Sequence, residues 1–163
     1  MKEKIRGRVW RFPSNVDTDQ IIPAEYLVMA DPVELGKHAF EKARPNFARS
    51  VKPGDIIVAD NNFGSGSSRE HAPRALIGCG ISCVIAKSFA RIFFRNSINI
   101  GLTLVECDVE AKEGEEVEVD FKKGVVKNLA SGKEFKFKPL PEFLIELIES
   151  GGLVEYVKKQ LGE

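Results

Sequence analysis

The sequence predicts one α/β domain, in which a parallel strand–helix core is followed by an antiparallel β-meander. In residues 55–107, short and nearly continuous apolar segments alternate with longer mixed ones, which is typical of parallel strands that are covered on both faces and connected by helices. In residues 116–138, apolar and charged residues alternate one by one, as in strands with one buried face. No repeat or low-complexity linker interrupts the chain, so we expect residues 1–163 to form a single domain.

Composition excludes several classes of protein. The 163 residues carry 24 Lys and Arg against 24 Asp and Glu, and 43% of them are hydrophobic. This balance favours a globular fold and removes the bulk attraction for nucleic acid. No apolar run reaches the roughly 18 residues of a membrane span, and the start lacks the apolar stretch of a signal peptide. We therefore expect a cytoplasmic protein that binds neither nucleic acid nor membranes.

The first third of the chain predicts one strand and one helix. The strand covers residues 5–12, and a turn-rich polar segment follows it. The helix is expected over residues 32–43, because Pro32 after Asp31 suits a first helical position. Residues 26–29 form an apolar patch beside this helix, which we expect to be exposed.

The centre of the chain alternates strands and helices. A strand over residues 55–59 runs into a Gly/Ser-rich loop. The next helix is predicted to extend to about Ile77, with Ser67 as its N-cap and Glu70 as the reciprocal partner of a capping box. A further strand, helix and strand are expected over residues 81–86, 89–99 and 102–107.

The final third is predicted to change architecture. Half-buried strands are expected over residues 116–121 and 134–138, with residues 124–129 between them in an antiparallel meander and turns near Gly124 and Gly132. A helix is expected to begin at Pro141 and to break at Gly151, and a last helix to run to Leu161.

The cysteines and histidines argue against a metal site on this chain. There are three cysteines and two histidines with no CxxC pair, and neither histidine stands at ligand spacing from a cysteine (Cys79, Cys83, Cys107, His38 and His71). Buried free thiols are the favoured interpretation, and a disulfide is the alternative that a cytoplasmic setting disfavours.

The loop over residues 64–71 has the chemistry of an anion site. Its glycines permit close approach to a ligand, a helix start offers unpaired N–H groups, and Arg69 can grip a carboxylate with two hydrogen bonds. The structural alternative is that Ser67 and Glu70 only cap the helix, and for His71 packing is favoured over ligand binding. The loop is neither a Walker A nor a GxGxxG motif.

Three segments in order resemble one known family. Residues 62–72 (NFGSGSSREHA), 17–23 (DTDQIIP) and 86–93 (AKSFARIF) resemble the motifs of the swivel domain of the aconitase superfamily. At this length the resemblance is to the separate small subunit of isopropylmalate isomerases and homoaconitases. It implies a swivelling β/β/α domain and covers nearly all of the chain.

The resemblance also implies a reaction and a partner. Family members interconvert hydroxy-acid isomers by dehydration and rehydration, with a [4Fe–4S] cluster held by a large subunit, so this chain would bind no cofactor itself and would be inactive alone. Ser67 would be the catalytic base. Ser68 and Arg69 would bind a hydroxy-dicarboxylate substrate, with Thr18 and Asp19 as supporting residues.

Residues 26–29 indicate which substrate is preferred. The stretch consists of Tyr26, Leu27, Val28 and Met29. In this region, aconitase-like and homoaconitase-like members of the family place an arginine that meets an extra substrate carboxylate. Here no Lys or Arg occurs between Arg11 and Lys37. An apolar lip suits an isopropyl group and leaves a further carboxylate unpaired. We therefore expect isomerisation of 2-isopropylmalate and 3-isopropylmalate in leucine biosynthesis, with a homoaconitase or citramalate-type isomerase as alternatives. The segment could instead be core or a subunit contact.

Two other classes of function stay open. A stand-alone anion-binding module would use the same glycine-rich loop but would not require all three motifs in order. A purely structural or regulatory subunit would make Ser67 and Arg69 dispensable.

Overall fold

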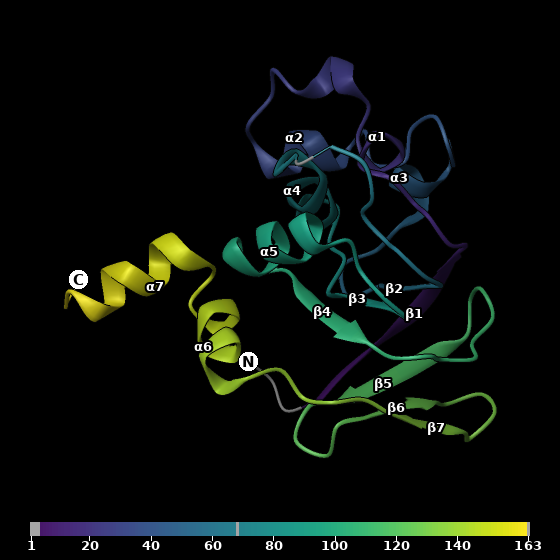
Figure 1. Ribbon diagram of the computed structural model, residues 1–163. Coiled ribbons are helices and arrows are strands. Elements are labelled where there is room, and N and C mark those ends of the chain that lie inside the picture. The colour runs from purple at the N-terminus through teal and green to yellow at the C-terminus, as the bar shows by residue number, and fades with distance from the viewer. Residues whose placement is uncertain (1–3, 68, 163) are drawn as a thin grey trace.

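The computed structural model describes residues 4–67 and 69–162. One seven-stranded mixed sheet runs through the molecule in the order β4-β3-β2-β1-β5-β6-β7 (Figure 1). The strands are β1 Lys4–Phe12, β2 Ile56–Ala59, β3 Cys83–Ala86, β4 Thr103–Glu106, β5 Glu116–Asp120, β6 Val125–Asn128 and β7 Glu134–Lys136. Strands β1 to β4 are parallel, whereas β5 to β7 form an antiparallel meander, so both predicted halves are confirmed.

Strand β1 joins the two halves of the sheet. Its second half pairs in parallel with β2, beginning at Val9 opposite Ile56. Its first half pairs antiparallel with β5, where Lys4 lies opposite Asp120. One long strand thus serves as the central neighbour of both the parallel and the antiparallel part.

Helices cover the parallel part and extend from it. They are α1 Thr18–Ile21, η1 Ala24–Tyr26 (a 3₁₀ turn), α2 Pro32–Gly36, α3 Phe47–Ser50, α4 His71–Gly78, α5 Arg91–Asn99, α6 Glu142–Glu149 and α7 Leu153–Gln160. Figure 1 shows α1 to α5 over the parallel strands, whereas α6 and α7 form an arm that points away from the sheet.

Two apolar clusters explain the buried strands. Ile57 and Ala59 of β2 pack into a cluster that includes the helices on one face, whereas Ile56 and Val58 pack with the meander on the other. Both faces of β2 are therefore buried, as its continuous apolar run predicts.

The predicted N-terminus of the helix at Ser67 is wrong. Helix α4 begins at His71 after Glu70, whose backbone is already helical, and no side chain caps it. Thr18 Oγ1 donates a hydrogen bond of 3.0 Å to the Ser67 carbonyl. Glu70 instead forms an ion pair with Arg74 at 3.6 Å, so the capping box does not form there.

A capping box does form at α1, where the sequence analysis did not place one. Asp17 accepts from the backbone N–H of Gln20, and the Gln20 side chain accepts from the backbone N–H of Asp17. This reciprocal pair closes the first turn of a four-residue helix that would be marginal without it.

Helix α2 is shorter than predicted because the chain turns inward. Asp31 precedes it and Pro32 opens it, as expected, but it ends at Gly36. Phe40 adopts a left-handed backbone with φ of 55° and is fully buried, stacked on Phe12 with ring centroids 4.4 Å apart. The aromatic core therefore overrides the helical pattern of residues 37–43.

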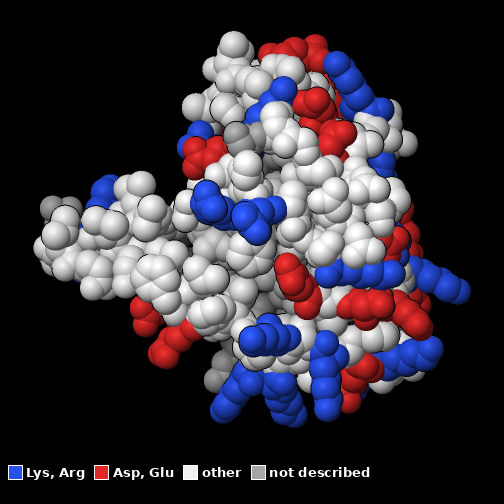
Figure 2. Space-filling model, in the orientation of Figure 1, with Lys and Arg blue, Asp and Glu red and all other residues white. Residues whose placement is uncertain are grey.

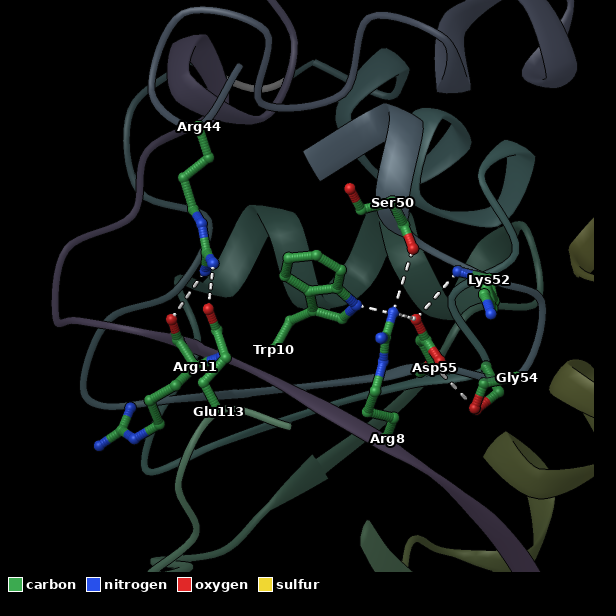
Figure 3. Close-up of polar contacts among 10 residues, drawn as sticks. Arg8, Trp10, Arg11, Arg44, Ser50, Lys52, Gly54, Asp55 and Glu113 are labelled. Atoms are coloured by element: carbon green, nitrogen blue, oxygen red, sulfur yellow. Dashed lines mark hydrogen bonds and ion pairs between the residues drawn. The ribbon is translucent and has the colours of Figure 1, made fainter. Parts of the chain in front are cut away.

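Asp55 fixes the start of β2 to β1 (Figure 3). Its buried carboxylate accepts from Trp10 Nε1 at 2.8 Å, from Arg8 Nη2 at 3.1 Å and from the Lys52 backbone N–H at 2.9 Å. Arg8 also donates to the Ser50 carbonyl at 3.0 Å. This network satisfies the carboxylate and holds the turn that precedes β2.

Charge is unevenly spread over the surface. Figure 2 shows Lys and Arg interspersed with Asp and Glu over the meander, whereas the arm of α6 and α7 is largely uncharged on this face. The exposed apolar residues of the arm are Phe143, Leu153, Val154, Val157 and Leu161. Among the described residues, no helix is long and apolar enough to cross a membrane.

Candidate functional site

The three motif segments meet at the carboxyl ends of the parallel strands. The loop after β2 is hydrogen-bonded on one side to the segment after β1, where Gly64 N–H donates to the Val16 carbonyl at 2.7 Å. On the other side, Ala90 N–H donates to the Phe63 carbonyl at 3.0 Å. Ligands of open α/β sheets bind at this edge, so the convergence marks the candidate site.

Glycines let the loop pass between its neighbours. Gly64 has φ of 87°, and a Cβ there would lie 2.1 Å from the Phe93 ring. Gly66 has φ of 96° and approaches Thr18 Oγ1. A side chain at Gly64 would therefore force apart the loop and helix α5.

Thr18 positions Ser67. Thr18 is almost fully buried, and its backbone N–H donates to the Ser65 carbonyl at 2.8 Å. Its hydroxyl lies 3.0 Å from the Ser67 carbonyl oxygen and 3.4 Å from Ser67 Oγ. Ser67 itself is exposed, so its hydroxyl is held from below by Thr18 and is open to a ligand from solvent.

Arg69 lies on the same side as α1. Its guanidinium forms an ion pair with the carboxylate of Asp19. The Arg69 side chain is 22% exposed and that of Asp19 is 65% exposed. The structure thus brings together Thr18, Asp19, Ser67 and Arg69, whereas Ser68 lies outside the described residues.

Charged residues at the base of the loop were not identified from the sequence. Asp60, the first residue after β2, pairs with Arg11 at 2.6 Å and with Lys87 at 3.6 Å. The hydrogen bond from Arg11 holds the pKa of the Asp60 carboxyl below its ordinary value. The available signal was a charged residue directly after each of two neighbouring parallel strands.

Residues 26–29 form an exposed turn. Met29 N–H donates to the Tyr26 carbonyl at 3.0 Å, and Val28 near its apex is 92% exposed. Tyr26 and Met29 pack against the core, and Leu27 is partly exposed. Val28 is therefore not a core residue, and its apolar side chain is exposed to solvent just before the helix that begins at Pro32.

The cysteines are free thiols. Cys83 and Cys107 are buried, and Cys79 is partly buried. Burial raises the pKa of Cys79 to about 12 and that of Cys107 to about 11. Among the described residues, no group of three His, Cys, Asp or Glu could hold a metal ion.

Comparison with known proteins identifies the family. Residues 50–110 match the aconitase C-terminal domain. The isopropylmalate/citramalate isomerase small subunit of Methanocaldococcus jannaschii is 55% identical over 100% of this chain and 99% of its own. The 3-isopropylmalate dehydratase small subunit of Aquifex aeolicus is 57% identical over 99% of this chain and 98% of its own.

A solved structure agrees with the sequence relatives. The crystal structure of 3-isopropylmalate dehydratase from M. jannaschii superposes with a TM-score of 0.93 at 46% identity, covering 96% of this chain and 95% of that one. The resemblance and the α/β swivel-type fold predicted from the sequence are confirmed. The chain therefore belongs to the family of 3-isopropylmalate dehydratase small subunits, within the aconitase superfamily.

Proposed function

We propose that this chain, as one swivel domain, is the small subunit of a heteromeric isomerase that interconverts 2-isopropylmalate and 3-isopropylmalate in leucine biosynthesis. A large subunit would supply the [4Fe–4S] cluster, and the chain alone would be inactive. The observation that carries the proposal is the cluster of Thr18, Ser67, Arg69 and Asp19, which lies at the ligand-binding edge of the sheet. The names of the relatives support the substrate.

Ser67 is the proposed base. It removes the proton on the carbon α to a substrate carboxylate, and the neighbouring carbon loses hydroxide, which leaves a cis-alkene. The proton on Ser67 and the hydroxide together make up the water that is eliminated. Water then adds back with the opposite placement of hydroxyl and hydrogen. With the large subunit docked, its cluster would supply Lewis-acid chemistry for the departing hydroxyl.

A serine hydroxyl is too weak an acid to lose its proton in water at neutral pH. To act as a base, the Ser67 alkoxide therefore needs hydrogen-bond donors and positive charge nearby. Thr18 Oγ1, 3.4 Å from Ser67 Oγ, can donate to a developing alkoxide after turning away from the Ser67 carbonyl. Arg69 adds a fixed positive charge in the same loop. Only the Thr18 hydroxyl has to rotate, so the anion is stabilised with little reorganisation.

Arg69 is the proposed carboxylate ligand. In the chain alone it is paired with Asp19, an exposed carboxylate that a substrate carboxylate can replace. Exchange of one carboxylate for another keeps the guanidinium paired throughout. The Arg69–Asp19 pair therefore holds the arginine near the site before substrate arrives.

The exposed turn around Val28 is the proposed selectivity lip. An apolar side chain there favours an isopropyl group over an added carboxylate, because an unpaired buried carboxylate costs several kcal/mol. A citramalate-type activity is the second candidate, supported by the name of the M. jannaschii relative, since apolar pockets discriminate poorly between sizes. The homoaconitase alternative is disfavoured, because residues 12–36 of this chain contain no Lys or Arg to pair with an extra substrate carboxylate.

The test is anaerobic reconstitution with the cluster-bearing large subunit of the same source. Turnover is measured in parallel with isopropylmalate, citramalate, homocitrate and citrate, and the chain alone is the control. We expect activity only in the complex, with isopropylmalate preferred. Anion binding by the chain without turnover in the complex would favour the stand-alone module instead.

A further inference from the structure

The exposed turn that carries Val28 is held by a polar cluster outside the catalytic residues. Tyr26 begins this turn and ends η1. Its hydroxyl donates to Glu41 Oε2. His38 Nδ1 lies 3.0 Å from the other oxygen of the same carboxylate. Glu41 therefore connects the lip to the segment that follows α2.

The two rings of this cluster also stack. The centroids of Tyr26 and His38 are 3.8 Å apart, with planes 11° from parallel. The hydrogen bond to Glu41 raises the pKa of Tyr26 to about 12, and the same contact lowers the pKa of Glu41. At neutral pH the pair is a phenol donating to a carboxylate, which is among the stronger side-chain hydrogen bonds.

The segment that bears Glu41 is itself rigidly placed. Phe40 is fully buried, and its N–H donates to the Ile21 carbonyl at 2.9 Å. Arg44 N–H donates to the Phe40 carbonyl at 2.7 Å. A second contact joins the same two segments, because Lys42 Nζ forms an ion pair with Glu25 Oε1 at 2.6 Å. The lip is thus attached to the aromatic core through residues 40–42.

We propose that Glu41 is a positioning residue for substrate selectivity, which holds Tyr26 and thereby sets the position of Val28 in the lip. This inference rests on the proposed function, because it assigns the lip to the isopropyl group. Glu41 itself contacts neither the substrate nor Ser67. Releasing Tyr26 would let the turn move, so the enzyme would lose discrimination and keep its chemistry.

The experiment compares Tyr26→Phe and Glu41→Gln in the reconstituted complex. Tyr26→Phe keeps the stacking ring and removes only the hydroxyl. Each variant should lower the ratio of kcat/KM for 2-isopropylmalate to that for citramalate by about three- to tenfold, the size of one lost hydrogen bond. The change should appear in KM, with kcat retained. Tyr26→Phe removes the hydrogen bond, and Glu41→Gln replaces its charged acceptor by a neutral amide oxygen. The double variant should be no worse than the more affected single one, because both changes act on the same contact.

The matched control is Glu34→Gln, which removes an exposed carboxylate paired with Lys37 in the neighbouring helix. It should leave the ratio unchanged. An unchanged ratio in Tyr26→Phe and Glu41→Gln, or a fall in kcat alone, overturns the inference.

Hydrogen exchange separates this inference from the proposed function. In the free chain, the amide N–H of Leu27 donates to the Ala24 carbonyl of η1 and that of Met29 to the Tyr26 carbonyl. Both should exchange faster in Tyr26→Phe and Glu41→Gln than in Glu34→Gln. Equal exchange rates in all three variants would show that the Tyr26–Glu41 contact does not hold the turn, and this result does not depend on enzyme activity. Lack of isopropylmalate turnover in the wild-type complex overturns the proposed function, while the exchange result still decides whether Glu41 holds the lip.

Discussion

Arg69 and Asp19 are 50 residues apart in sequence, yet they form an ion pair at the edge of the sheet. The pair joins the loop after β2 to helix α1, so the two motif segments share one charged contact. Because Asp19 is largely exposed, the pair adds little to stability and leaves the arginine available for exchange.

Replacing Arg69 should weaken substrate binding with little effect on folding. Arg69→Gln is expected to raise KM for isopropylmalate by about 10- to 100-fold, since a charge-assisted hydrogen bond contributes about 1.5–3 kcal/mol. Arg69→Lys should restore only part of the loss, because an ammonium cannot form the two-pronged contact. Steady-state kinetics of the complex measure both, with urea unfolding as the check on folding. A KM equal to wild type in Arg69→Gln would remove the arginine from the binding role.

Replacing Ser67 should abolish chemistry and spare assembly. Ser67→Ala is expected to lower kcat by about 10²- to 10⁴-fold, the usual contribution of a positioned base. Association with the large subunit, measured by gel filtration, should be unchanged. Ser50→Ala is the control, because Ser50 is exposed and its contacts with Asn46 and Arg8 are made by its backbone. Near-normal turnover of Ser67→Ala would require another base.

Replacing Val28 should change selectivity. Val28→Arg places a cation on the lip and should shift the preference towards homocitrate or citrate. The fold should tolerate it, because the valine is 92% exposed. Val33→Arg, at a residue 58% exposed in the adjacent helix, is the matched control and should shift nothing. Equal losses on every substrate in Val28→Arg would count against the selectivity role.

Acid should release one stabilising contact at the base of the loop. The pKa of Asp60 is lowered in the folded chain, first by its hydrogen bond from Arg11. Its contribution is therefore fully present above the ordinary aspartate value of about 3.9 and is lost as the pH falls through the lower folded value. Asp60→Asn should lose stability at pH 6 and less at pH 3. Urea midpoints at the two pH values measure this, and an equal loss at both would contradict it.

Removing Asp55 should destabilise the sheet. Asp55→Ala leaves two part-buried donors, Trp10 Nε1–H and the Lys52 backbone N–H, without their acceptor (Figure 3). A fully buried donor left unpaired costs about 1–3 kcal/mol, which sets the upper limit for each of them. Urea unfolding measures the loss. Asp31→Ala is the control, since Asp31 is exposed and its side chain makes no capping hydrogen bond. Equal stability of the two variants would show that the network contributes nothing.

Local pattern was sufficient for the strands and for most of the helices. The apolar run of β2 predicts burial on both faces, and Ile56 and Ile57 do pack into different clusters. Pattern failed at Ser67, where a good capping sequence lies within a loop held by Thr18. It failed again at Phe40, which turns the chain to reach the aromatic core. In both cases a long-range contact outweighs a local preference worth about 1 kcal/mol.

The sequence by itself determined the parallel core, the meander, the absence of Lys and Arg from residues 12–36 and, through three ordered motifs, the family. Only the tertiary structure decided that Thr18 lies against Ser67, that Arg69 pairs with Asp19 and that Glu41 holds Tyr26. Residue spacing encodes periodic burial, which is local. Side chains from separate loops meet only after β1 and β2 have paired in register, and that pairing depends on the packing of the whole sheet.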